Sequence, residues 1–71
     1  MMEQMRITTF VASCNAMPSM NSPIIGVAKE GTVVDVLERG ERWHKVSFQD
    51  KKKTVAGYTL AACLADVPQS R

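Results

Sequence analysis

The fold of this chain is decided by the stretch Ser22-Pro23-Ile24-Ile25-Gly26-Val27-Ala28-Lys29-Glu30-Gly31-Thr32-Val33-Val34-Asp35-Val36-Leu37. It holds two short runs rich in β-branched residues, separated by a Glu-Gly pair, and such runs between turn residues are typical of β-strands. In the second run, an alternation of period two places Val34 and Val36 on one face and Asp35 on the other. The stretch therefore predicts two strands, with Val34 and Val36 turned toward the core.

Turn residues divide the rest of the chain into pieces too short for ordinary helices. Between them lie the predicted strands: Ile7 to Ala12, Ile24 to Ala28, Thr32 to Glu38, Trp43 to Phe48, and Thr54 to Tyr58. Five short strands at this spacing predict an all-β fold, a small five-stranded barrel. Helix formers in residues 60–64 predict a single 3₁₀ turn that packs Leu60 or Leu64 onto the barrel. We expect an N-terminal arm over 1–6, the barrel over 7–64 and a frayed tail over 65–71.

Size and composition argue against an enzyme. A chain of 71 residues forms one domain with a thin core, which leaves little stability for a deep catalytic cavity. The net charge of +2 indicates no particular partner. Cys14 and Cys63 lack metal-site spacing, so we interpret them as small buried apolar residues, and whether they are bridged stays open. We expect no catalytic residues, no metal and no cofactor.

The N-terminus, Met-Met-Glu-Gln-Met-Arg, lacks the basic and apolar regions of a signal peptide. No apolar stretch has the length of a membrane span. From the chain as given, we expect a complete cytoplasmic product with no membrane partner.

At the stretch quoted above, the chain resembles the bacterial SH3-like family, in which a Ser-Pro-hydrophobic-hydrophobic-Gly turn precedes Lys-x-Gly-Thr and a valine-rich strand. Two further segments are similar to family landmarks, in order and in spacing. Trp43-His44-Lys45-Val46 is similar to its Gly-Trp-x-Lys-Val strand, and Gly57-Tyr58-Thr59-Leu60-Ala61-Ala62-Cys63-Leu64 to its closing Gly-Trp-Val-x-x-x-Tyr-Leu. Cys14-Asn15-Ala16-Met17-Pro18 lies where the family carries Leu-Asn-Val-Arg-x-Gly-Pro, so the first loop is shortened and lacks the usual Arg and Gly. The resemblance covers Ile7 to Leu64.

The resemblance implies an SH3-like barrel that binds a ligand without catalysis. Members of the family are best known for binding peptidoglycan peptides, and others bind proteins or metals. This chain departs from the family at Cys63, where a tyrosine of the peptide groove is common, and at Leu60, where eukaryotic relatives carry a proline. With four aromatic residues in all, a groove for polyproline ligands is not expected.

Trp43 is the first candidate for ligand contact. The period of its strand places Trp43, Lys45 and Ser47 opposite the core-facing His44, Val46 and Phe48, so the indole lies on the outer face. Tyr58 on the adjacent strand could share a platform with it, and Lys45 lies on the same side. The alternative is that the two aromatic rings seal an open end of the barrel.

Met17 and Met20, in the first loop, are adaptable thioether side chains that could extend this contact surface. Loop methionines also fold back over cores. An apolar patch of this kind on a small protein marks an interface, including one with a second copy.

Lys51, Lys52 and Lys53 form a basic run that could contact nucleic acid, although a solvated hairpin tip explains it better because no aromatic residue is interleaved. His44, the one histidine, is interpreted as structural. The leading expectation is therefore a module that binds a protein or peptide, such as a phage or mobile-element product acting on a host protein. A module for peptidoglycan peptides is the first alternative, and nucleic-acid binding the second.

Overall fold

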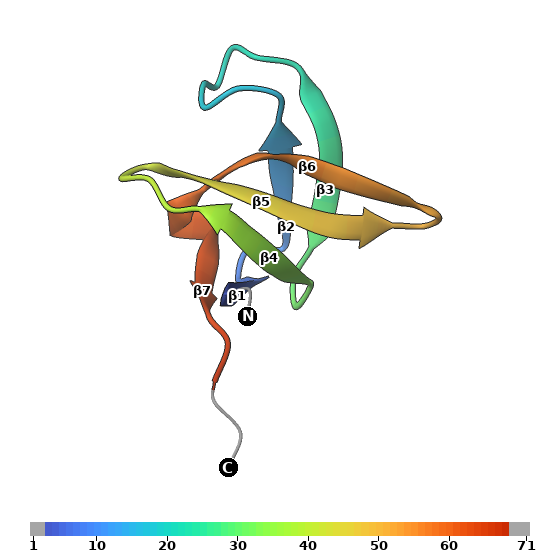
Figure 1. The fold of residues 1–71 in the computed structure, drawn as a ribbon, viewed down its shortest axis with the longest axis vertical. Coiled ribbons are helices and arrows are strands. Elements are labelled where there is room, and N and C mark those ends of the chain that lie inside the picture. Colours follow the sequence, from blue (N-terminus) through green and yellow to red (C-terminus); the bar gives the residue numbers. More distant parts are fainter. Residues whose placement is uncertain (1–2, 69–71) are drawn as a thin grey trace.

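The computed structural model describes residues 3–68 of the chain. Seven strands and one turn of 3₁₀ helix follow one another along this segment (Figure 1). They are β1 (Glu3–Ile7), β2 (Val11–Asn15), β3 (Ile24–Lys29), β4 (Val33–Glu38), β5 (Trp43–Asp50), β6 (Lys53–Leu60), η1 (Ala61–Cys63) and β7 (Leu64–Asp66). The predicted all-β class and the predicted 3₁₀ turn are confirmed.

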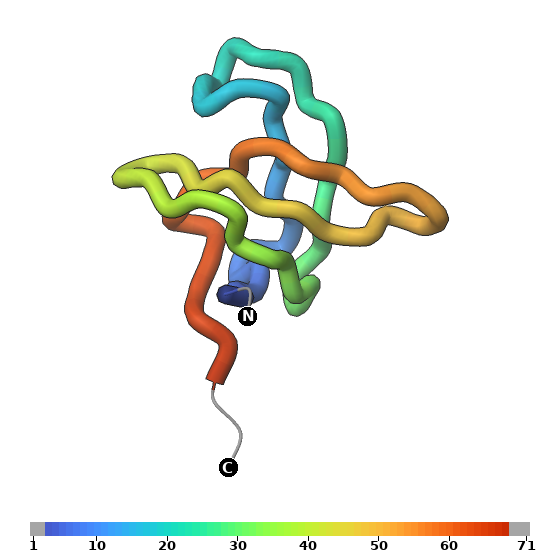
Figure 2. The backbone as a smooth tube through the Cα atoms, viewed as in Figure 1, coloured from blue at the N-terminus to red at the C-terminus, as the bar shows by residue number. Residues whose placement is uncertain are grey.

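The seven strands form one antiparallel sheet in the order β3-β2-β6-β5-β4-β1-β7. The sheet is strongly bent: the ribbon of β2 and β3 runs crosswise to β5 and β6 (Figures 1 and 2). This arrangement is consistent with an SH3-like fold. The predicted closed barrel of five strands is wrong, because the sheet has seven strands and stays open, with β3 and β7 at its two edges.

The two additional strands come from the ends of the chain. β1 falls largely within the predicted arm, residues 1–6, and β7 extends into the predicted tail, residues 65–71. β1 pairs with β4 on one side and β7 on the other, so its backbone groups find partners along both edges. These pairings give part of the predicted arm and part of the predicted tail a regular strand structure. Residues 1–2 of the arm and 69–71 of the tail lie outside the described part of the chain.

The predicted strand from Ile7 to Ala12 is also wrong. β1 ends at Ile7, the chain reverses, and β2 begins at Val11. In the reversal, the Thr9 hydroxyl donates a hydrogen bond to the carbonyl oxygen of Val11 at 2.8 Å. Phe10 is left 84% exposed. The turn contains no Gly or Pro, so nothing in its composition separates it from the strands on either side.

The core lies between the crossed parts of the sheet and follows the predicted period. Val34 and Val36 are buried, and β5 alternates so that His44, Val46 and Phe48 point inward. Cys14 is buried and Cys63 is half-buried against the core, and the two thiols are not bridged. Leu64, after the 3₁₀ turn, is buried as expected. No helix within residues 3–68 has the length and apolar character needed to cross a membrane.

Candidate ligand-binding groove

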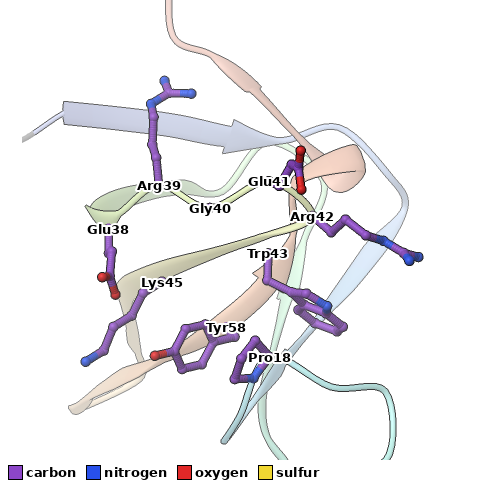
Figure 3. A pocket seen from close by; sticks show the side chains of 9 residues that line it. All are labelled: Pro18, Glu38, Arg39, Gly40, Glu41, Arg42, Trp43, Lys45 and Tyr58. Carbon is purple, nitrogen blue, oxygen red and sulfur yellow. The ribbon is translucent and has the colours of Figure 1, made fainter.

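A surface groove with a volume of ≈ 370 Å³ lies where three segments of the chain meet. One segment is the loop between β2 and β3, which contributes Pro18, and the second is the hairpin of residues 38–42 between β4 and β5. The third is the paired end of β5 and β6, which contributes Trp43, Lys45 and Tyr58. In Figure 3, the rings of Trp43, Tyr58 and Pro18 gather at one side of the groove, beside the Lys45 side chain.

The register of β5 and β6 explains why these side chains meet. Lys45 pairs with Tyr58, and Trp43 pairs with Leu60 two residues further along. Residues that pair across strands share a face, and diagonal neighbours stay within reach of an aromatic ring. Because His44 and Val46 fill the core face, Trp43, Lys45 and Tyr58 all project outward, each of them half-buried. Trp43 and Lys45 thus lie on the outer face of the sheet, as predicted.

The hairpin of residues 38–42 is held by contacts to two other elements. Nδ1 of the buried His44 accepts a hydrogen bond from the backbone N–H of Gly40 at 3.2 Å. The backbone N–H of Ala61 donates to the carbonyl oxygen of Arg42 at 2.8 Å. His44 therefore has a structural partner on the core side of the groove, as the sequence analysis expects of a lone core-facing histidine.

The loop of residues 16–23 is fixed by Asn15, a buried polar residue. Asn15 Nδ2 donates to the carbonyl oxygen of Ser19 at 3.0 Å, while Oδ1 accepts from the hydroxyl of Ser13 at 3.0 Å. The hydroxyl of Ser22 closes the loop, since it lies within hydrogen-bond distance of both the carbonyl oxygen and the amide nitrogen of Met17. A loop bonded in this way presents Pro18 to the groove in a defined position.

The charges around the groove are mixed. Arg39 belongs to the hairpin, but its Nε donates to both carboxylate oxygens of Glu3 (3.0 and 2.9 Å) and its Nη2 donates to Asp66 at 3.2 Å. These hydrogen bonds lower the pKa of Glu3 and raise the pKa of Arg39. The Arg39 guanidinium is thereby engaged with β1 and β7. Arg42 and Lys45 also line the groove, Arg42 beside Trp43 and Lys45 beside Tyr58, with Glu38 opposite Lys45 in the ladder (Figure 3).

The remaining predicted site residues lie outside this groove. Met17 and Met20 belong to the same loop and are 59% and 72% exposed, but Pro18, between them, is the residue that lines the groove. Lys51, Lys52 and Lys53 lie at the turn between β5 and β6, at the opposite end of β5 from Trp43. Sequence reasoning missed Pro18 and Asn15. An Asn just before a Met-Pro-Ser turn was the available signal, because Asn side chains commonly bond nearby loop backbone.

Groups that could do chemistry are sparse around the groove. Within residues 3–68, no group of three His, Cys, Asp or Glu side chains is placed to hold a metal ion. Burial raises the pKa of the Cys14 thiol, with a weaker opposing effect from the Thr59 side chain, so this thiol stays protonated at neutral pH. The residues that line the groove offer apolar rings, hydrogen-bond donors and charged side chains of both signs.

A comparison with models of protein families shows to which family the chain belongs. The family model described as Bacterial SH3 domain matches residues 16–65, from the loop that follows β2 into β7. No curated protein and no solved structure gives a significant match to the chain. Domains of the matching family are in general binding modules, often related to the cell wall. Since the match covers well over half of its 71 residues, the chain belongs to the bacterial SH3 domain family.

Proposed function

We propose that this protein is a binding module that takes an extended segment of a protein or peptide in the groove formed by Trp43, Tyr58, Pro18 and Lys45. The observation that carries the proposal is the convergence of two aromatic rings, one each from β5 and β6, with a proline from the loop between β2 and β3. Such rings offer a large apolar area that costs little side-chain entropy on binding, and Trp and Tyr dominate the energetics of protein interfaces. Lys45 adds a cation that would pair with a carboxylate of the ligand.

Preorganisation supports the same proposal. The loop is bonded through Asn15 and Ser22, and the hairpin through His44 and Arg42, so both walls of the groove are held by contacts that do not involve a ligand. Binding to walls already in place avoids much of the entropy of ordering them. A groove that is open and rigid suits a short extended segment better than a small molecule that needs enclosure.

A selection from a random peptide library displayed on phage tests the proposal. We expect the wild-type protein to enrich peptides whose affinity falls about tenfold or more in Trp43→Ala, as for a central aromatic contact. Phe10→Ala is the matched control, because Phe10 is an exposed aromatic residue outside the groove. Enriched peptides that bind wild type and Trp43→Ala equally would remove the groove as the ligand site.

A second candidate ligand is a peptidoglycan peptide, which membership of the bacterial SH3 domain family favours. Such peptides are short and extended and carry carboxylates that suit Lys45. Co-sedimentation with purified peptidoglycan separates the two ligands: a cell-wall module is depleted from the supernatant and Trp43→Ala is not. A module for protein segments remains in the supernatant in both forms.

A further inference from the structure

A second apolar surface lies on the outer side of β2 and β3 and shares no residue with the groove. It consists of Phe10, Val11, Ile24 and Val27, which are 84%, 48%, 62% and 52% exposed. We call these four residues the outer apolar face. None of them lines the groove around Trp43.

The strand register places Val11 and Val27 on the outer side of the ribbon formed by β2 and β3. Ala12 pairs with Ala28 and Cys14 with Gly26, and these pairs point into the core. Val27, opposite Ser13, therefore faces outward. The register shifts after Cys14, and Ile24 then pairs with Asn15, whose buried side chain is bonded to the loop of residues 16–23, while Ile24 itself is exposed. Val11 also faces outward, opposite Lys29, and Phe10 lies next to Val11 at the mouth of a shallow hollow that includes Lys29 and Glu30.

β3 is therefore apolar on both faces, although only its inner face is covered by the chain. A strand that reads as a continuous apolar run is typical of one buried on both sides. Four residues with these exposed fractions present roughly 400 Å² of mostly apolar surface. A standard interface buries about 800 Å² per partner, and a little under two thirds of it is apolar in homodimers. The outer apolar face therefore supplies most of the apolar area that one side of such a dimer needs.

The charges at the border of this face favour a second copy of the chain over an unrelated partner. Lys29 and Glu30 are adjacent, exposed and, within residues 3–68, not engaged in an ion pair. A partner of one charge sign would meet a like charge at this border, whereas a second copy carries both signs and can pair each with its opposite.

We propose that two copies of this chain associate through the outer apolar face, with β2 and β3 of each copy packed face to face across a two-fold axis. The inference is independent of the ligand proposed for the groove, because the two surfaces share no residue. Sedimentation equilibrium from micromolar to near-millimolar concentration tests it. The wild-type chain is expected to show a monomer of 7.8 kDa in equilibrium with a species of twice that mass.

Two variants at the face and one matched control decide the assignment. Val27→Lys places a charge in the centre of the interface and is expected to raise the dissociation constant of the dimer at least tenfold. Phe10→Ser removes a side chain outside every strand, and should have the same effect even if Val27→Lys perturbs folding. Val33→Lys is the control, since Val33 has a similar exposure of 46% but lies on β4.

The expected pattern is self-association in the wild type and in Val33→Lys, with loss of it in Val27→Lys and Phe10→Ser. A wild-type chain that stays monomeric at near-millimolar concentration overturns the proposal. So does self-association that persists in both face variants, or that is lost equally in Val33→Lys.

Discussion

Asn15 pairs with Tyr58 in the register that joins β2 to β6, so one residue links both sides of the groove. Its backbone lies beside the strand that carries the Tyr58 ring, while its side chain donates to the carbonyl oxygen of Ser19 in the loop that presents Pro18. The loop and the aromatic floor are therefore fixed relative to each other through a buried residue that does not line the groove.

Replacing Asn15 by Ala tests this link. The change removes the hydrogen bond from Asn15 to the Ser19 carbonyl, which keeps its bonds from Ser22, and leaves the Ser13 hydroxyl without its acceptor. We expect the free energy of unfolding to fall by about 1–2 kcal/mol. Affinity for a selected peptide should also fall, because the loop must then be ordered on binding. Urea denaturation and titration calorimetry measure the two effects. Asn21→Ala, in the same loop but exposed, should change neither, and an Asn15→Ala protein with wild-type stability and affinity would show that the link is unimportant.

Gly57 permits the close approach of β2 and β6. A Cβ at this position would lie 2.5 Å from the carbonyl oxygen of Asn15 and 2.9 Å from Cys14 Sγ. Because the nearest atom belongs to the backbone, the strands must separate, and we expect Gly57→Ala to lower the free energy of unfolding by about 2–3 kcal/mol. The neighbouring exposed change Ala56→Gly should cost less than about 1 kcal/mol. Equal effects in the two denaturation curves would contradict the close-contact account.

Lys51 carries backbone strain at the turn between β5 and β6. Asp50 pairs with Lys53, which leaves a two-residue turn in which Lys51 has φ 62°, in the left-handed region. Glycine has no steric penalty there, so Lys51→Gly should raise the free energy of unfolding by about 1 kcal/mol and the Tm by several degrees. Lys52→Gly should not stabilise, because Lys52 has an ordinary φ. Equal changes in Tm for the two variants, measured by scanning calorimetry, would contradict the strain at Lys51.

The ion pair between Glu3 and Arg39 predicts a dependence of stability on pH. Hydrogen bonding to Arg39 lowers the pKa of Glu3 in the folded protein, so the folded state holds this proton less tightly than the unfolded state. The stabilisation is present above the ordinary carboxyl pKa, near 4.3, and is lost as pH falls through the lowered value. Glu3→Gln should therefore show a shallower loss of Tm on acidification than the wild type, and added salt should shrink the difference.

Glu30→Gln is the control for that series. Glu30 is an exposed carboxylate for which no ion pair occurs within the described residues. The dependence of its Tm on pH should follow that of the wild type. If the Tm of Glu3→Gln shows the same dependence on pH as both, the pair with Arg39 contributes nothing to folding.

The sequence predicted the central strands well because each carries a strong local pattern. Val34 and Val36, and the alternation along β5, have period two with apolar residues on one side, which fixes the face that each residue occupies. The hairpin at Gly40 was predicted from its turn residues. The 3₁₀ turn was predicted from a run of helix formers too short for a longer helix. The outer positions of Trp43 and Lys45 came from the alternation along β5.

The features that the sequence did not predict depend on partners distant in the chain. β1 is a strand because β4 and β7 bond it on both sides, and its residues Glu3, Gln4 and Arg6 carry no apolar signal. The reversal before Val11 contains neither Gly nor Pro, so it was read as part of a strand. The place of Pro18 in the groove depends on the hydrogen bond from Asn15 to the loop; an Asn before this turn indicates a bond to nearby loop backbone, but not that the loop lies beside β5 and β6.

Chemical-shift mapping with a selected peptide tests the central claim most directly. In ¹⁵N-resolved spectra of the full chain, we expect the largest changes at the Trp43 indole N–H and at the amides of Lys45 and Tyr58, because these groups line the groove. The chemical shifts of the amides around Val27 on the outer apolar face should not change. Saturable shifts confined to other surfaces, with the Trp43 indole signal unmoved, would contradict the assignment of this groove as the ligand site.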